Sequence, residues 1–246
     1  MNAPPPDASW NDPDRLASAI GRFAPFKSWP LPARLRLARA GKASSHPPGA
    51  LLIEYDRPEQ ALTFVLEGAT QASITDPGGR RVTFRYDAST MVFGLAPMVD
   101  GKPSINELLA QDRVKILRVP FTAVMAELSA APALWESIGV ELCERFRHTA
   151  QQMTRFVFDE PRVHMAALLV GLAGKAAQGR DAGPVTIDMR LSQELLAEML
   201  AISRQWAAQL IQEMVKDGLV QWRYGRATLL NIQRLRAIAG GSISGG

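Results

Sequence analysis

Hydrophobic and polar residues alternate along the chain from about Gly49 to Pro120. The alternating segments read ALLIEYD, LTFVLEG, TQASITD and RVTFRYD, with turns at Glu67-Gly68 and DPGGR, and VKILRVP follows. A period of two places successive side chains on opposite faces of a strand, and Gly-containing turns join strands into hairpins. Several short strands at nearly regular spacing predict an antiparallel barrel or roll, with VKILRVP as its closing strand.

The segments on either side have helical periodicity. Before the strands, DPDRLASAIGRF has a proline at an early helical position, and LPARLRLARAG ends on Gly41, which suits a helix stop. After Pro132, apolar positions alternate by four and three residues, the spacing of a coiled-coil seam. The seam consists of Trp135, Gly139, Leu142, Phe146, Thr149, Met153 and Phe156. We expect it to pair with a second chain; the alternative is a helix packed on its own barrel.

Two short helices joined by a tight turn are predicted near the C-terminus. Ser192 can cap the first helix, AIS is the connection, and Ser203 can cap the second. An amphipathic helix in DEPRVHMAALLVGLAGKAAQ and a short strand after GRDAG precede them, and LVQWR and RATLLNI alternate as strands around Tyr224-Gly225. This layout is that of a winged helix-turn-helix, whose second helix enters the major groove of DNA.

The second of these helices, Ser203 to Lys216, separates an apolar stripe from a polar face. The stripe consists of Ala207, Leu210, Ile211, Met214 and Val215. On the polar face Arg204 can donate two hydrogen bonds to guanine, and glutamines can pair with adenine edges or phosphates. Hairpin arginines would meet the DNA backbone. The predicted DNA-contacting residues are Ser192, Ser203, Arg204, Gln205, Trp206, Ala208, Gln209, Gln212, Arg223 and Arg226.

Composition limits the class of protein. A chain of 246 residues, 47% hydrophobic and 21% charged, has room for two modest domains, and its net charge of +4 permits a polyanionic partner. The single cysteine, Cys143, excludes an internal disulfide and a Cys-rich metal site within one chain, and it fits a reducing cytoplasm. The N-terminus lacks the features of a signal peptide, and no stretch approaches the ~20 apolar residues of a membrane span. We therefore expect a cytoplasmic protein without a membrane segment.

The helix-turn-helix segment LSQELLAEMLAISRQWAAQLIQEMVKDGLV resembles that of the Crp/Fnr (catabolite-activator) superfamily of bacterial transcription regulators. FVLEGATQASITDPGGRRVTFRYDASTMVFG is similar to that family's β-roll sensor, and PALWESIGVELCERFRHTAQQMTRF to its dimerisation helix. The resemblance implies a homodimeric regulator that is not an enzyme. The implied partners are double-stranded DNA and a second copy of the chain, with RNA polymerase as a further candidate.

The expected fold class is α+β, with three parts in chain order. They are an N-terminal antiparallel β-roll sensor of the cyclic-nucleotide-binding-like type, a long dimerisation helix and a C-terminal winged helix-turn-helix. The expected boundaries are 1–23 for a flexible tail and short helix, 24–130 for the β-roll, 131–160 for the dimerisation helix and 161–246 for the DNA-binding domain.

The stretch FGLAPMVDGKPSIN departs from the family's phosphate-binding cassette. Relatives that bind cyclic nucleotides have Gly-Glu, followed by an Arg-Ser or Arg-Thr pair. Here Gly94 is retained, but Leu95 replaces the glutamate and Ser104-Ile105 replaces the pair. A buried phosphate would lack its guanidinium partner. We therefore predict no cofactor and expect neither cyclic AMP nor cyclic GMP as effector. The candidate effector pocket is Phe93, Gly94, Leu95, Ser104, Ile105 and Asn106.

The DNA-reading helix also departs from the family pattern, which opens Arg-Glu-Thr and has a later arginine. This chain keeps Arg204 but has Gln205, Trp206 and Gln209 at the other three positions. The preferred DNA sequence should therefore differ from the family's best-known half-sites. The Trp206 indole either donates to a phosphate or packs at the helix edge.

Other functions remain as alternatives. A cupin-like metal enzyme would need clustered His and Glu ligands, and the stretch through residue 130 contains only His46. A haem sensor would have only His46, His148 and His164 as candidate histidine ligands, and Cys143 is either a redox switch or a buried inert thiol. The same fold could also use its β-roll as a ligand-independent dimerisation or protein-contact module.

Overall fold

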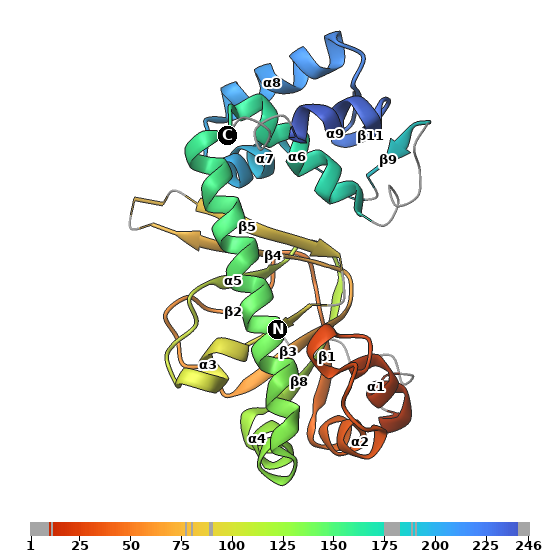
Figure 1. Ribbon diagram of the computed structural model, residues 1–246, viewed down its shortest axis with the longest axis vertical. Coiled ribbons are helices and arrows are strands. Elements are labelled where there is room, and N and C mark those ends of the chain that lie inside the picture. Colours follow the sequence, from red (N-terminus) through yellow and green to blue (C-terminus); the bar gives the residue numbers. More distant parts are fainter. Residues whose placement is uncertain are drawn as a thin grey trace. The chain divides into compact units, whose positions relative to one another are not determined.

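The computed structural model describes residues 10, 12–76, 78–79, 81–88, 91–174, 183–187, 189 and 191–240. The chain divides into two compact units, residues 1–147 and 148–246. The helix α5 (Trp135–Phe158) belongs to both, because the boundary falls within it (Figure 1). Of the expected parts, most of the N-terminal tail lies outside the described residues.

The first unit begins with the two predicted helices, α1 (Pro13–Ile20) and α2 (Leu31–Ala40), with the short 3-10 helix η2 (Ala24–Phe26) between them. The carboxylate of Asp12 accepts the amide N–H of Asp14 and caps α1, with proline in its first turn. At the end of α2 the N–H of Gly41 donates to the carbonyls of Leu37 and Ala38. Both helices are therefore fixed by local signals in the sequence.

Two four-stranded antiparallel sheets follow, as the alternating pattern predicts. Their strands are β1 (Lys42–His46), β2 (Leu51–Ile53), β3 (Ala61–Glu67), β4 (Ala69–Thr75), β5 (Arg81–Ala88), β6 (Val92–Phe93), β7 (Glu107–Ala110) and β8 (Val114–Pro120). The strand orders are β1-β8-β3-β6 and β2-β7-β4-β5. The segment VKILRVP, predicted as the closing strand, is β8; it lies inside its sheet and pairs with both β1 and β3.

Strand β3 shows how the β-roll is packed. Phe64 lies in a core shared with the N-terminal helices, where its ring meets that of Phe23 edge to face, with centroids 5.0 Å apart. Val65, its neighbour, faces the other way, into a second core with Phe93 and Ile116. Both faces of β3 are buried, which fits its almost continuously apolar sequence ALTFVLE.

Helix α4 (Phe121–Ala130) and the short η3 (Pro132–Leu134) connect β8 to α5. The guanidinium of Arg36 on α2 donates two hydrogen bonds, of 2.5 and 2.8 Å, to the Glu127 carboxylate of α4. This bidentate contact raises the pKa of Arg36 through hydrogen bonding to the carboxylate. It links α2 to α4.

The predicted seam on α5 divides between two faces of the helix. Trp135 and Leu142 pack against the core of their own unit, so the assignment of these two to a seam with a second chain is corrected. Phe156 is 38% exposed, and its ring meets that of His164 edge to face. Gly139, Phe146, Thr149 and Met153 are exposed. An exposed row with the same four-three spacing runs through Gly139, Cys143, Phe146, Ala150, Met153 and Val157. We call this row the α5 stripe; Cys143 on it is exposed rather than buried.

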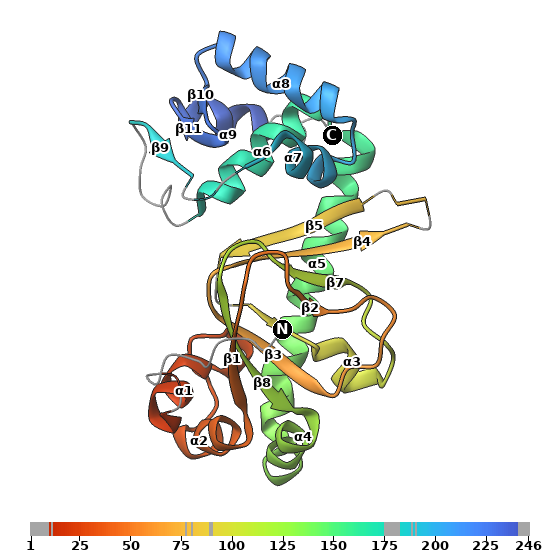
Figure 2. The same ribbon diagram turned by 180° about the vertical axis from the view of Figure 1, so that it is seen from behind.

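The second unit is built on short helices and a small sheet (Figure 2). Its elements are α6 (Pro161–Ala173), β9 (Val185–Thr186), α7 (Gln193–Leu200), α8 (Arg204–Lys216), β10 (Val220–Arg223), β11 (Arg226–Leu229) and α9 (Ile232–Gly240), with the sheet order β10-β11-β9. The predicted helix of this region ends at Ala173, and residues 175–182 lie outside the described part. Within the residues described, no helix is both long and apolar enough to cross a membrane.

Candidate nucleic-acid interface

Helices α7 and α8 begin at the two predicted serine caps. The Ser192 Oγ accepts the amide N–H of Leu195 at 3.0 Å, and the Ser203 Oγ accepts that of Trp206 at 3.1 Å. Between them Ala201 has a left-handed backbone with φ 52°, a conformation that glycine usually provides. Each serine hydroxyl hydrogen remains available to a phosphate, because capping uses only the oxygen as acceptor.

The apolar stripe of α8 is confirmed in four of its five members. Ala207, Leu210, Ile211 and Met214 are buried, and α8 packs against α6, α7 and β10. Val215 is 43% exposed, so the prediction that it belongs to the buried stripe is wrong. It lies in the last turn, next to Met214, which is only 1% exposed. Burial of the stripe leaves the opposite face of α8 to solvent.

The outward face of α8 carries most of the residues predicted to read DNA. Arg204, Gln205, Gln209 and Gln212 are exposed, Trp206 is 45% exposed and Ala208 is half-buried. Two of these side chains are held by carboxylates. The Gln209 Nε2 donates to the Glu213 Oε1 at 3.0 Å, and the Arg204 Nη1 lies 2.9 Å from the Glu194 Oε1 of α7. Neither carboxylate was singled out from the sequence, because such partners depend on side-chain geometry.

Strands β10 and β11 form a hairpin with a two-residue turn. Arg223 and Arg226 face each other across it, and Tyr224 and Gly225 both have positive φ, of 50° and 74°. This is the conformation of the mirror-image turns that suit the twist of a tight hairpin. Tyr224 is 91% exposed, and both arginines are exposed.

Tyr224 is a candidate contact that sequence reasoning missed. An aromatic residue between two arginines at a predicted hairpin tip was the available signal, since nothing within such a short turn can bury its ring. The hairpin of β10 and β11, which is the wing of the fold, therefore has two guanidinium groups and a phenol at the same end.

The far end of α8 is fixed to α6. The Arg162 Nη2 lies 2.5 Å from the Asp217 Oδ2, just beyond the last turn of α8. This hydrogen bond lowers the pKa of Asp217, and the positive charges of Arg162, Arg234 and Lys216 lower it further. The carboxylate is therefore charged at neutral pH and anchors the helix that carries the polar face.

The six residues predicted for the effector pocket occupy different environments. Gly94 has φ 93°, and a Cβ there would lie 3.0 Å from the Ala61 carbonyl oxygen, so glycine is required. Leu95 is buried in the core that the β-roll shares with the N-terminal helices. Phe93 is buried in the second core, together with Val65. Ile105 is 66% exposed.

Ser104 and Asn106 are engaged by their own loop. The Ser104 Oγ donates to the Asn106 carbonyl at 2.8 Å, and the Asn106 Nδ2 donates to the Glu107 carbonyl at 3.2 Å. Backbone hydrogen bonds also join Ser104 to Asp56 and Arg57. These contacts use the polar atoms that a ligand in the cassette would need.

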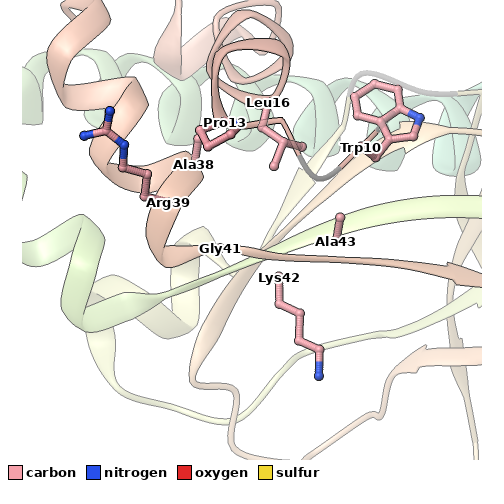
Figure 3. A pocket seen from close by; sticks show the side chains of 8 residues that line it. All are labelled: Trp10, Pro13, Leu16, Ala38, Arg39, Gly41, Lys42 and Ala43. Carbon is pink, nitrogen blue, oxygen red and sulfur yellow. The ribbon is translucent and has the colours of Figure 1, made fainter. Parts of the chain in front are cut away.

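A hollow of about 480 Å³ lies beside α1, the end of α2 and β1 (Figure 3). It is lined by Trp10, Pro13, Leu16, Ala38, Arg39, Gly41, Lys42 and Ala43. The side chains of Arg39 and Lys42 point away from Leu16 and Trp10 (Figure 3). Ligand sites usually bring a few polar groups together over an apolar floor. This hollow has the floor without converging polar groups, so we do not assign the effector to it. In the described part of the chain, no group of three or more His, Cys, Asp or Glu residues could hold a metal ion.

The fold and the outward face of α8 define a winged helix-turn-helix protein with an antiparallel β-roll. Residues 163–238 match the family model of the Crp-like helix-turn-helix domain. None of the curated proteins matches the chain. Over these residues the match confirms the helix-turn-helix part of the resemblance to the Crp/Fnr superfamily that the sequence shows.

Solved structures share this architecture at low sequence identity. A CRP/FNR-family transcriptional regulator from Thermus thermophilus is 20% identical, with a TM-score of 0.67, and the match covers 82% of this chain and 100% of that one. The c-di-GMP-responsive regulator CLP of Xanthomonas campestris is 18% identical, with a TM-score of 0.69 and coverage of 82% and 99%. FixK2 from Bradyrhizobium japonicum is 16% identical, with a TM-score of 0.71 and coverage of 80% and 96%. At this level of identity, these similarities show that the chain has the same fold as the three regulators.

Proposed function

We propose that the protein is a homodimeric transcription regulator that acts in the cytoplasm and reads a near-palindromic operator with α8. The observation that carries this proposal is the outward row of Arg204, Gln205, Gln209 and Gln212, whose helix is held from behind by four buried apolar residues. Long hydrogen-bonding side chains on a rigid, exposed helix match the donor and acceptor pattern of base edges in the major groove. RNA polymerase is a further partner if the protein activates transcription.

The roles of the contacts differ. Arg204 can donate in bidentate fashion to the O6 and N7 of guanine and so distinguish base pairs. Arg223 and Arg226, at the wing, suit phosphates, which add affinity without sequence information. Two copies related by a two-fold axis would place their half-sites about one helical turn apart, roughly 34 Å.

The direct test compares Arg204→Ala with Arg223→Ala on a duplex selected by the wild-type protein and on a scrambled duplex. Arg204→Ala should weaken binding to the selected duplex by ~1–3 kcal/mol per half-site. The largest loss of sequence discrimination should occur at one G·C pair. Arg223→Ala should weaken binding to both duplexes about equally and reduce the salt dependence by about one counterion. Equal weakening of both duplexes by Arg204→Ala would show that Arg204 is only a backbone contact.

We also propose that the effector is neither cyclic AMP nor cyclic GMP. Leu95 is buried in the core, and Ser104 is hydrogen-bonded within its own loop, which supports a cassette without the charged groups for a ribose and a cyclic phosphate. The response to c-di-GMP is a property of the Xanthomonas regulator and is not part of this proposal.

A further inference from the structure

The contact between Glu194 and Arg204 brings a negative charge onto the proposed DNA-reading surface. The Glu194 Oε1 lies 2.9 Å from the Arg204 Nη1, and the two side chains are 56% and 65% exposed. Glu194 lies in the first turn of α7, and Arg204 is the first residue of α8. The ion pair therefore spans the turn of the helix-turn-helix. Exposed ion pairs contribute little to folding stability, so its main effect concerns what Arg204 can bind.

A carboxylate at this position affects phosphates and bases differently. It repels every phosphate that approaches, whatever the DNA sequence, and it cancels the attraction that Arg204 alone would exert. A guanidinium has five N–H donors in a planar fork, and the contact with Glu194 engages one terminal nitrogen. The remaining donors can still form two hydrogen bonds to guanine. Glu194 thus opposes non-specific attraction while leaving base recognition open.

The pair also restrains an arginine that would otherwise sample many rotamers. Its partner Glu194 is itself placed by α7, whose first turn is capped by Ser192. A side chain held before binding loses less conformational freedom when it meets a matching base. Gln209 is held by Glu213 in a similar way, so two residues of the polar face have a carboxylate partner.

We propose that Glu194 is a specificity-determining residue that acts by positioning and screening Arg204. The proposal rests on the proposed function, because it requires α8 to read DNA. It predicts that loss of the negative charge improves binding to random DNA more than binding to the operator.

The test uses the full-length variant Glu194→Gln with two probes: a duplex selected from a random pool by the wild-type protein, and a scrambled duplex of equal length and composition. Dissociation constants are measured by fluorescence anisotropy at one salt concentration. The scrambled duplex should bind about three- to tenfold more tightly, as expected for removal of one repulsive surface charge. The selected duplex should gain less, so the ratio of the two constants falls. An unchanged or larger ratio would overturn the proposal.

Two further variants separate the explanations. Glu160→Gln changes the net charge equally at another exposed position of the same unit, and it should leave the ratio unchanged. In an Arg204→Ala background, Glu194→Gln should no longer alter the ratio, because its action passes through Arg204. The same loss of discrimination without Arg204 would contradict that route. If Arg204→Ala alone weakened both duplexes equally, the role of Arg204 under the proposed function would fail, independently of Glu194.

Discussion

At the scale of single residues, the turn between α7 and α8 depends on an alanine in a left-handed conformation. Ala201 has φ 52° because the chain must reverse direction between two helices with only three residues, 201–203. The left-handed region costs a Cβ-bearing residue roughly 1–2 kcal/mol, whereas glycine adopts it freely. The helix-turn-helix therefore contains a strained position at its centre.

Ala201→Gly should stabilise the protein by roughly 0.5–1 kcal/mol, because relief of strain exceeds the added entropy of the unfolded chain. Urea unfolding followed by circular dichroism measures the change. Ala197→Gly is the matched control: the same substitution inside α7 should destabilise by about 1 kcal/mol. Destabilisation by both variants would show that Ala201 is not strained.

His164 gives stability a dependence on pH. Burial lowers its pKa, and Arg155 lowers it further, while Asp159 opposes the shift. As pH falls through the ordinary histidine range near 6.5, the unfolded chain takes up a proton before the folded chain does. The free energy of unfolding should therefore decrease on acidification. His46 adds a slope of the same sign, since burial and Arg118 lower its pKa too.

His164→Gln should flatten this slope, because the substituted side chain does not titrate. Thermal unfolding between about pH 5.5 and 7.5, the range around the histidine pKa, measures it. His46→Gln is the comparison and should remove only the smaller share of the slope that the lowered pKa of His46 contributes. If His164→Gln left the slope as steep as in the wild type, His164 would not be its source.

Several residues of the interface could be predicted from the sequence, and others could not. The serine caps and the buried stripe of α8 depend on local spacing, so they were correct except for Val215 at the helix end. Glu194 was not identified, because its contact with Arg204 depends on how two helices pack. Tyr224 was missed because aromatic residues are usually associated with cores.

At the scale of elements, helix α5 has one face that packs on its own unit and a neighbouring face that is exposed. Trp135 and Leu142 bind it to its own unit, and the α5 stripe remains exposed beside that face. The four-three spacing in the sequence predicts an apolar row on α5, but it does not show which of two neighbouring rows is exposed. Strand β1 was not predicted, because KASSH has little apolar alternation.

The α5 stripe is the surface on which we expect a second copy to pack. Phe146 is 75% exposed at its centre, and an exposed aromatic ring in a heptad row favours burial by a partner helix. Phe146→Glu should raise the dimer dissociation constant on the order of 100-fold or more and yield monomers in sedimentation. Gln151→Glu adds the same charge off the stripe and should leave the dimer intact. A wild-type protein that is monomeric at micromolar concentration would contradict this expectation.

At the scale of the whole molecule, an antiparallel β-roll and a winged helix-turn-helix occur in one chain, in the order that the sequence pattern predicted. The regular pattern of strands and the capped helix pair are strong signals, because each follows from local periodicity. The effector is not determined in this way, since it depends on a few side chains in the cassette.

Neither cyclic nucleotide should bind to the intact protein. Isothermal titration calorimetry with cyclic AMP and with cyclic GMP should show no binding tighter than about 1 mM, a binding free energy of about −4 kcal/mol. The physical reason is the missing carboxylate and guanidinium at Leu95 and Ser104. Micromolar binding of either nucleotide would show that other residues hold the phosphate.

The pairing of β1 with β8 has a consequence for how the protein folds during synthesis. Lys42 of β1 pairs with Arg118 of β8, and β2 pairs with β7. The strands that are synthesised first therefore pair with strands that are translated much later. Pairings between residues far apart in sequence form slowly, because closing a long loop costs entropy before any contact stabilises it. The first sheet cannot be completed until β8 has left the ribosome. Until then β1 and β3 lack their shared neighbour, and their unpaired edges favour aggregation.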